Sequence, residues 1–370
     1  MRFTHILRRH WPEYIARNGG ATKIPAVYWR AVEAVLSCRT ARLGGHVYSC
    51  QECKSERFAY HSCNHRACPQ CGSSGQQLWS ARQQARRLPV PYFMLTFTVP
   101  EPLRWFFLRY DCVAYGLLFT AASEAIKELF ADPKHFGGQA GFTAVLHTWT
   151  RQMEFHPHLH VLVPAVAIGE SGTEVIRAKD PEFLLPHAAL ARRYREQFLS
   201  RLRDKHPGLF KTIDPSLGST NWNINIQSVG RGKRALRYLA AYVKKSAFSE
   251  QRLAGYDENG RIRLWWRDSK DGKRKLMTLE ASELIRRWLL HVLPKGLTRV
   301  RHYGFLSAAA VKSYRRLRFL LGGKAFTVDL PKSEPPICPC CGEAMQLQSK
   351  LLPVRGPPLS RAILDNQPCQ

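Results

Sequence analysis

The chain has 370 residues, 45% of them hydrophobic, which is enough to bury a sizeable core in two or three domains and excludes a disordered chain. Its 56 lysines and arginines against 28 acidic residues give a formal net charge of +28, so a polyanion is the natural partner. Proteins bound to ribosomes or to a membrane surface share this charge bias.

No segment resembles a signal peptide or a membrane span. The first ten residues lack an apolar run of signal-peptide length, and no later run approaches the ~18 residues that cross a bilayer. The 11 cysteines fall mostly into CxxC pairs, which is typical of metal binding in a reducing compartment rather than of disulfides. We therefore expect a soluble, cytoplasmic protein with no membrane partner, associated with the nucleoid when it is bound to DNA.

The N-terminal part of the chain predicts two helices followed by a segment that needs a ligand. Residues 1–37 carry apolar residues at helical intervals around a pair of glycines. Residues 38–71 include few aliphatic side chains, so their own core is too small to hold this segment folded without a metal ion. A basic helix is expected over about residues 76–88, and a central strand over residues 92–99 opens a second domain.

The middle of the chain mixes strands and helices without strict βαβ alternation. A turn at residues 268–272 joins two strand-like segments into a hairpin, which favours an α+β fold over a doubly wound α/β fold. We expect helices over about residues 103–130, 183–203 and 232–246, and strands over about 142–149, 158–166 and 222–229. The predicted domains are residues 1–88, residues 89–330 and a Pro-rich tail over residues 331–370.

Two CxxC pairs predict a zinc site. Cys50 and Cys53 form the first pair, and Cys68 and Cys71 form the second. Their separation is near the spacing at which two such turns face each other and complete a tetrahedral thiolate site. We therefore expect a zinc-ribbon-like domain in which structural Zn²⁺ supplies the folding free energy that the small core lacks.

The same block holds further ligand types that could bind a second zinc ion. Cys38, His46 and Cys63, with either His61 or His65, would make a Cys₂His₂ set. His46 could equally be a solvated residue beside a glycine turn, so the second site stays open.

A third CxxC pair lies near the end of the chain. Cys338 and Cys341 form a single turn, which cannot fill a tetrahedron alone. It would need Cys369 and another ligand, so we regard it as a weak zinc signal.

A His-hydrophobic-His triplet begins the strand expected at residues 158–166. The two-residue period of a strand places His158 and His160 on one face and Leu159 on the other. Two imidazoles on one face can bind Mg²⁺ or Mn²⁺ and leave open positions for phosphate oxygens. The alternative is a pair of hydrogen-bonded structural histidines at a sheet edge.

Two tyrosines on one predicted helix are candidate nucleophiles. Tyr238 and Tyr242 are four residues apart, so both hydroxyls can reach the same site. Attack by a phenolate on DNA would leave a 5′-phosphotyrosine and a free 3′-hydroxyl, and would conserve the bond energy for rejoining without ATP or any nucleotide cofactor. The alternative is a tyrosine stripe that packs the helix on the sheet.

Over nearly its whole length the chain resembles the IS91-type transposases and their relatives in common-region elements. The residues that carry the resemblance are Cys38-Arg-Thr-Ala-Arg-Leu-Gly-Gly-His-Val-Tyr-Ser-Cys50, Ser62-Cys-Asn-His-Arg-Ala-Cys-Pro-Gln-Cys71, Leu146-His-Thr-Trp149, His156-Pro-His-Leu-His160, Tyr238-Leu-Ala-Ala-Tyr242 and Arg301-His-Tyr-Gly-Phe305. In one departure, Ala67 stands where relatives often have histidine, which weakens the case for the second zinc site.

The resemblance implies a zinc-binding DNA-contact domain followed by an HUH-type endonuclease domain with a ferredoxin-like antiparallel sheet backed by helices. It implies that His158 and His160 hold the catalytic metal and that Tyr238 and Tyr242 are the nucleophiles. A third metal ligand is usual in such enzymes, and no motif fixes it here. The candidates are Gln152, Glu154 and His147, whereas Pro157 could turn His156 away from the pair.

The function implied is rolling-circle DNA transposition, in which the enzyme binds a single-stranded or hairpin end of the element, cuts it and rejoins it. A plasmid or phage replication initiator would use the same chemistry at an origin. A zinc-dependent DNA-binding protein without catalysis is the alternative from another class.

Overall fold

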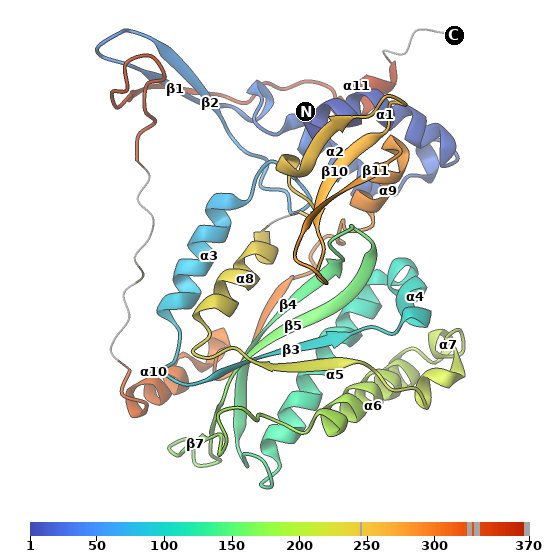
Figure 1. Cartoon of the computed structure of the whole chain (residues 1–370), viewed down its shortest axis with the longest axis vertical. Helices are drawn as coiled ribbons and strands as arrows, with labels where there is room; N and C mark the ends of the chain where they lie inside the picture. Colours follow the sequence, from blue (N-terminus) through green and yellow to red (C-terminus); the bar gives the residue numbers. More distant parts are fainter. Residues whose placement is uncertain (245, 324–327, 329–333, 366–370) are drawn as a thin grey trace.

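A computed structural model describes residues 1–244, 246–323, 328 and 334–365 (Figure 1). It is a mixed α+β structure, as the sequence predicts, with three antiparallel sheets among its described residues. Cys369 and the expected domain boundary at residues 330–331 lie outside the described residues, and the division of the chain into three domains remains a prediction. No helix in the described part of the chain is long and apolar enough to cross a membrane.

The largest sheet has seven strands in the order β7-β6-β4-β5-β3-β8, with β12 also paired to β4, and every pairing is antiparallel. Its two middle strands, β4 and β5, are buried on both faces along most of their length, which explains their many apolar residues. The strands are β3 (Tyr92–Thr98), β4 (Gln139–Trp149), β5 (Phe155–Pro164), β6 (Val166–Ile168), β7 (Val175–Arg177), β8 (Ile224–Ser228) and β12 (Val300–Gly304).

Helices cover both faces of this sheet. Alternate residues of β3 face opposite sides, since Phe93 and Leu95 belong to the core beneath α5 and α6, whereas Met94 belongs to the core beneath α8. One face carries α4 (Arg104–Arg109), α5 (Asp111–Ala131), α6 (His187–Lys205) and α7 (Pro207–Phe210). The other carries α3 (Ser73–Ala85), α8 (Lys233–Lys244) and α10 (Val311–Leu320).

The helix expected over residues 103–130 is two helices, because the chain leaves helical geometry at Tyr110, where φ is −127° and ψ is 48°. The break lets α4 turn back over the core, where Phe106 and Phe107 are fully buried. The other expected helices and strands are present, with boundaries shifted by a few residues.

A second core joins the beginning of the chain to residues 247–292. Phe3 of α1 packs edge-on against Phe248 and Trp288, with ring centroids 5.0 Å from each. The helices here are α1 (Phe3–Arg17), α2 (Ala26–Ser37), α9 (Ala281–Leu289) and α11 (Leu359–Asp365). The sheet here is formed by β9 (Leu253–Tyr256), β10 (Ile262–Arg267) and β11 (Arg274–Leu279), in the order β11-β10-β9.

A small third sheet brings the two ends of the chain together. The hairpin of β1 (Gly45–Ser49) and β2 (Glu56–Tyr60) extends away from the rest of the molecule (Figure 1). β13 (Gln346–Leu351) pairs with the free edge of β1, so the order is β13-β1-β2. The tail therefore does not hang free of the cysteine block but completes its sheet.

Candidate active site

Three histidines converge on adjacent strands of the large sheet. His158 and His160 lie on one face of β5, and His147 on β4 is the direct cross-strand partner of His158. Nδ1 of His147 is 3.0 Å from Nε2 of His158, and one ring nitrogen from each of the three lies within 4.8 Å of the others. This convergence forms a candidate metal site.

Neighbouring groups orient two of these rings. Nδ1 of His158 donates to the backbone carbonyl of His156 at 2.7 Å, so its Nε2 is the nitrogen left to bind a metal. Nδ1 of His160 lies 3.1 Å from Oγ1 of Thr96, which in the same way leaves Nε2 of His160 facing the cluster.

All three rings are held in the neutral form. Burial lowers the pKa of His158 to about 3, with a further contribution from His160, and burial lowers the pKa of His160 to about 4. Burial and the adjacent His158 lower the pKa of His147 well below its usual value. At neutral pH the three imidazoles are therefore unprotonated, which is the form that binds a metal ion.

Both predicted tyrosines stand over the histidines. Leu236, Leu239 and Val243 pack α8 on the sheet, and the tyrosine face of the helix is turned towards β4 and β5. The ring centroid of Tyr242 is 4.0 Å from that of His147, and the centroid of Tyr238 is 5.7 Å from that of His160.

The two tyrosines differ in exposure. Tyr238 has 45% of its surface exposed. Tyr242 is half-buried, and burial together with the adjacent Tyr238 hydroxyl raises its pKa. The ring centroids of the two tyrosines are 4.7 Å apart, so both hydroxyls serve the same cavity.

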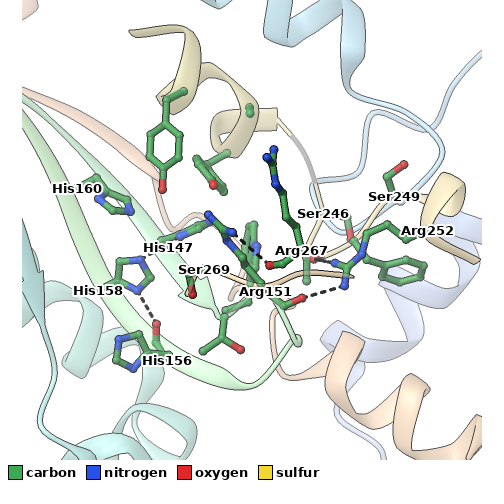
Figure 2. A pocket seen from close by; sticks show the side chains of 17 residues that line it. His147, Arg151, His156, His158, His160, Ser246, Ser249, Arg252, Arg267 and Ser269 are labelled. Atoms are coloured by element: carbon green, nitrogen blue, oxygen red, sulfur yellow. Dashed lines mark hydrogen bonds between the residues drawn. The ribbon is translucent and has the colours of Figure 1, made fainter. Parts of the chain in front are cut away.

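These groups line a cavity of about 610 Å³. Figure 2 shows the histidines on one side and side chains from the loop after β4 and from residues 246–269 on the other. Among the described residues, its lining includes three arginines and no carboxylate, so the cavity suits an anionic ligand. The lining residues are His147, Trp149, Thr150, Arg151, His156, His158, His160, Tyr238, Ala241, Tyr242, Ser246, Ala247, Phe248, Ser249, Arg252, Arg267 and Ser269.

Sequence reasoning missed the three arginines of the cavity: Arg151, Arg252 and Arg267. Arg151 lies two residues after the end of the strand that carries His147, and this closeness in sequence could have pointed to it. Arg252 and Arg267 come from the segment that packs on the N-terminal helices, and no motif connects that segment to the site. The guanidinium of Arg252 donates to the backbone carbonyls of Trp265 at 2.6 Å and of Arg151 at 2.8 Å, so it braces the cavity wall.

The other candidates for a third ligand lie outside the cluster. Gln152 and Glu154 are not among the residues that line the cavity. His156 does line it, but its Nδ1 accepts a hydrogen bond from Nη2 of Arg104 at 3.2 Å.

The structure corrects the grouping of the cysteines. The expected set of Cys50, Cys53, Cys68 and Cys71 is not brought together. Instead, Cys68 and Cys71 lie beside two cysteines of the possible second site. The sulfurs of these four residues are all within 4.8 Å of one another. The first tetrad is Cys38, Cys63, Cys68 and Cys71.

The other pair, Cys50 and Cys53, meets the C-terminal turn of Cys338 and Cys341, and these four sulfurs form a second tetrad. The described cysteines form no disulfides. The turns from residues 50 and 68 separate because β1 and β2 carry the first one out along the projecting hairpin, whereas the second stays against the N-terminal helices.

The histidines of the cysteine block belong to neither tetrad. The ring of His46 packs edge-on against His61, with centroids 4.9 Å apart, rather than joining Cys38 and Cys63. Nδ1 of His65 accepts a hydrogen bond from the backbone N–H of Ala67 at 3.2 Å. The possible Cys₂His₂ site is therefore not assembled in the described residues, since Cys68 and Cys71 lie beside Cys38 and Cys63 in place of the histidines.

Comparison with known proteins identifies the family. A family model described as "Transposase zinc-binding domain" matches residues 6–99, and one described as "Putative transposase" matches residues 141–314. The chain is 37% identical over 319 residues to "Putative transposase y4qJ" of Sinorhizobium fredii, a match that covers 81% of this chain and 79% of the relative. The chain belongs to the IS91 family of transposases.

A second relative supports this membership. The chain is 27% identical over 356 residues to "Transposase for insertion sequence element IS801" of Pseudomonas savastanoi pv. phaseolicola, a match covering 90% of this transposase and 85% of the relative. No solved structure matches the chain.

The matched regions coincide with two of the three sites. The zinc-binding model includes the whole first cysteine tetrad, and the transposase model includes the three histidines and both tyrosines. Cys338 and Cys341 lie beyond both matched regions. Transposases act on DNA, which accounts for the net charge of +28.

Proposed function

We propose that this transposase cuts and rejoins single-stranded DNA at the ends of its element by metal-dependent attack of a tyrosine, as a rolling-circle enzyme of the HUH type. One observation carries this proposal: both tyrosines of α8 stand over the three converging histidines within one cavity.

His147, His158 and His160 would hold the catalytic divalent ion. The fit rests on three buried, neutral imidazoles and on Nε2 of His147, a buried nitrogen that has no hydrogen-bond partner. An all-nitrogen donor set favours Mn²⁺ over Mg²⁺, which prefers oxygen ligands. When bound, the ion would polarise the scissile phosphate as a Lewis acid.

Tyr238 or Tyr242 would supply the nucleophile. The phenol loses its proton to solvent as its oxygen attacks phosphorus, and the bond from phosphorus to the 3′-oxygen breaks as that oxygen takes up a proton from solvent. The products are a 5′-phosphotyrosine and a free 3′-hydroxyl, which can later reverse the reaction at a new end. Two tyrosines at one cavity would allow two cleaved strands to be held in succession.

Cationic side chains would position the DNA. Arg151 and Arg267 line the cavity beside the histidines and are exposed. Their charges would contact phosphates on either side of the cut, and the exposed ring of Tyr238 can stack on an unpaired base.

The arrangement of the large sheet supports an HUH endonuclease fold. The elements follow one another as β3, α5, β4, β5, α6 and β8, and their strands lie in the order β8-β3-β5-β4 with α5 and α6 on one face. This order is that of a ferredoxin-like sheet backed by two helices.

The tetrad of Cys38, Cys63, Cys68 and Cys71 would hold a structural zinc ion. It lies within the zinc-binding family match and joins the end of α2 to the turn before α3. The ion would thereby fix the helices that pack on residues 247–292, the segment that forms one wall of the cavity.

A denaturing gel tests the proposed chemistry. The full chain is incubated with labelled single-stranded oligonucleotides from the element ends and Mn²⁺ or Mg²⁺, and we expect a covalent protein–DNA adduct that EDTA abolishes. The double change Tyr238→Phe, Tyr242→Phe should remove it, whereas Tyr256→Phe, which alters a tyrosine outside the cavity, should not.

An adduct that survives the double change would refute the tyrosine mechanism. Tight DNA binding with no adduct under any condition would instead favour a zinc-dependent DNA-binding protein without catalysis.

A further inference from the structure

Two cysteine turns from opposite ends of the chain face each other at the projecting sheet. Cys50 and Cys53 lie in the turn between β1 and β2, and Cys338 and Cys341 lie just before β13. All four sulfurs are within 4.8 Å of one another. This group is separate from the catalytic cavity and from the tetrad around Cys38.

The backbones of the two turns match. In the first, Lys54 has φ of 55° and its N–H donates to the carbonyl of Cys50 at 3.1 Å. In the second, Gly342 has φ of 82° and its N–H donates to the carbonyl of Cys338 at 3.0 Å.

A further hydrogen bond repeats the match. The N–H of the first cysteine in each turn donates to a carbonyl five residues later, from Cys50 to Ser55 at 2.9 Å and from Cys338 to Glu343 at 2.8 Å. Two turns of the same geometry, with their sulfurs directed at one point, form the usual zinc-binding arrangement of CxxC pairs.

The distances between sulfurs fit a shared ion. Sγ of Cys50 is 3.4 Å from Sγ of Cys341, and Sγ of Cys53 is 3.5 Å from Sγ of Cys338. Two thiolates on one tetrahedral zinc ion are about 3.8 Å apart, since each bond is about 2.3 Å, whereas a disulfide is about 2.05 Å. The observed separations of 3.4 and 3.5 Å are therefore much nearer to those of thiolates sharing a zinc ion than to a disulfide bond.

The described residues of this region form almost no apolar core of their own. Its buried cluster consists of Cys50, Cys338 and Met345, with Tyr48 packed against it. So small a core cannot hold a three-stranded sheet together, and a bound metal ion is the usual substitute.

We propose that Cys50, Cys53, Cys338 and Cys341 bind a second structural Zn²⁺, which fastens the C-terminal tail of the transposase to its N-terminal hairpin. β13 then pairs along β1 as the third strand. Beyond β13 the tail is fixed again, since the backbone N–H of Ser360 donates to Oε2 of Glu33 on α2 at 2.8 Å. The second zinc thus joins segments some 290 residues apart, and its binding free energy stabilises the folded chain.

Zinc content tests the proposal. The full chain is purified with the changes His158→Ala and His160→Ala, so that the catalytic site does not add to the count, and zinc is measured by mass spectrometry after dialysis against a weak chelator. We expect two zinc ions per chain, and one after Cys338→Ser and Cys341→Ser are added. Cys340→Ser is the matched control, because it alters the same turn outside the tetrad and should leave two.

Cobalt substitution and proteolysis extend the test. Co²⁺ in place of zinc should give the absorption of two tetrathiolate sites, halved by Cys53→Ser alone. Loss of the second zinc should also make the segment before β13 cleavable by protease. A parent protein that binds one zinc per chain and keeps it after Cys338→Ser and Cys341→Ser would overturn the proposal, and so would oxidised Cys50 and Cys341 in a thiol count under reducing purification. A single zinc that is lost with these two changes would instead count against the proposed zinc at Cys38, Cys63, Cys68 and Cys71.

Discussion

His147 shows how one residue on a neighbouring strand completes a site that a motif only begins. It faces His158 across the β4–β5 ladder, whereas His156, two residues along β5, turns its ring to Arg104. The motif therefore supplies two of the proposed ligands, and the register of the sheet brings the third proposed ligand beside them.

We expect His147→Ala to weaken Mn²⁺ binding by about 100-fold, because one of three protein ligands is lost. The measurement is a calorimetric titration of the zinc-loaded protein with Mn²⁺. His156→Ala is the control and should change the affinity by less than about three-fold. If both changes had equal effects, His147 would not be a ligand.

His291 gives the protein a pH dependence apart from the metal site. It is almost fully buried, its Nε2 donates to the carbonyl of Met153 at 3.1 Å, and Thr148 lies 3.2 Å from its Nδ1. Burial lowers its pKa to about 4, against about 6.5 in the unfolded chain. Below pH 6.5 the unfolded chain therefore binds a proton at His291 that the folded chain does not. The free energy of unfolding is highest above pH 6.5 and decreases as the pH falls towards 4.

Between pH 7 and pH 5 we therefore expect the free energy of unfolding to fall by about 2 kcal/mol more in the parent protein than in His291→Gln. Urea unfolding of both zinc-loaded proteins at the two pH values measures this difference. Parallel losses in the two proteins would show that His291 is not the group responsible.

At the residue scale, the sequence predicts those sites whose residues are close together along the chain. His158 and His160 share a strand, and Tyr238 and Tyr242 share a helix, so simple periodicity places each pair. The partners of Cys50 could not be predicted in this way, because Cys338 is brought to it only by the pairing of β13 with β1.

At the scale of elements, Gly304 allows β12 to join the sheet. Its φ is +54°, and a Cβ atom there would collide with the backbone oxygen of Ala140 on β4. Both the conformation and the close approach require glycine.

We expect Gly304→Ala to lower the free energy of unfolding by about 2–4 kcal/mol, measured by urea denaturation. Gly260→Ala isolates the contribution of the conformation, since Gly260 has φ of +74° with no atom within 4 Å of an added Cβ. That change should cost about 1 kcal/mol. Equal costs would show that close packing at Gly304 is unimportant.

Hydrophobic periodicity predicted most of the helices and strands, but it failed where contacts between distant segments determine the structure. The break between α4 and α5 at Tyr110 has no proline or glycine to mark it, and it occurs because two phenylalanines of α4 pack into the core. β13 has a mostly polar and exposed sequence, so nothing but its partner β1 makes it a strand.

For the whole molecule, the sequence gives charge and class but not the packing of distant segments. The order of the predicted strands and helices indicated an α+β fold, and the net charge indicated a polyanion as partner. Family membership supports DNA as that polyanion. The packing of residues 247–292 on α1 and α2 could not be predicted, because an apolar face does not by itself specify which other apolar face it contacts. That packing is what brings Arg267 to the cavity.

The charge of the molecule predicts that single-stranded DNA binding weakens steeply with salt. Removing one phosphate contact with Arg267→Ala should reduce the slope of log K against log salt by about 0.7. Fluorescence anisotropy with a labelled oligonucleotide measures this slope. Arg203→Ala, on α6 across the sheet from the cavity, should leave the slope unchanged, and an equal reduction there would mean that the DNA does not pass the cavity.

The most direct measurement of the central claim is mass spectrometry of the protein–DNA adduct after digestion with nuclease and trypsin. Trypsin cleaves after Arg237 and Lys244, so both candidate nucleophiles fall on the single peptide 238–244. We expect this peptide to carry a nucleotide through a 5′-phosphate on Tyr238 or Tyr242. A nucleotide on any other peptide, or an adduct attached through a 3′-phosphate, would contradict it.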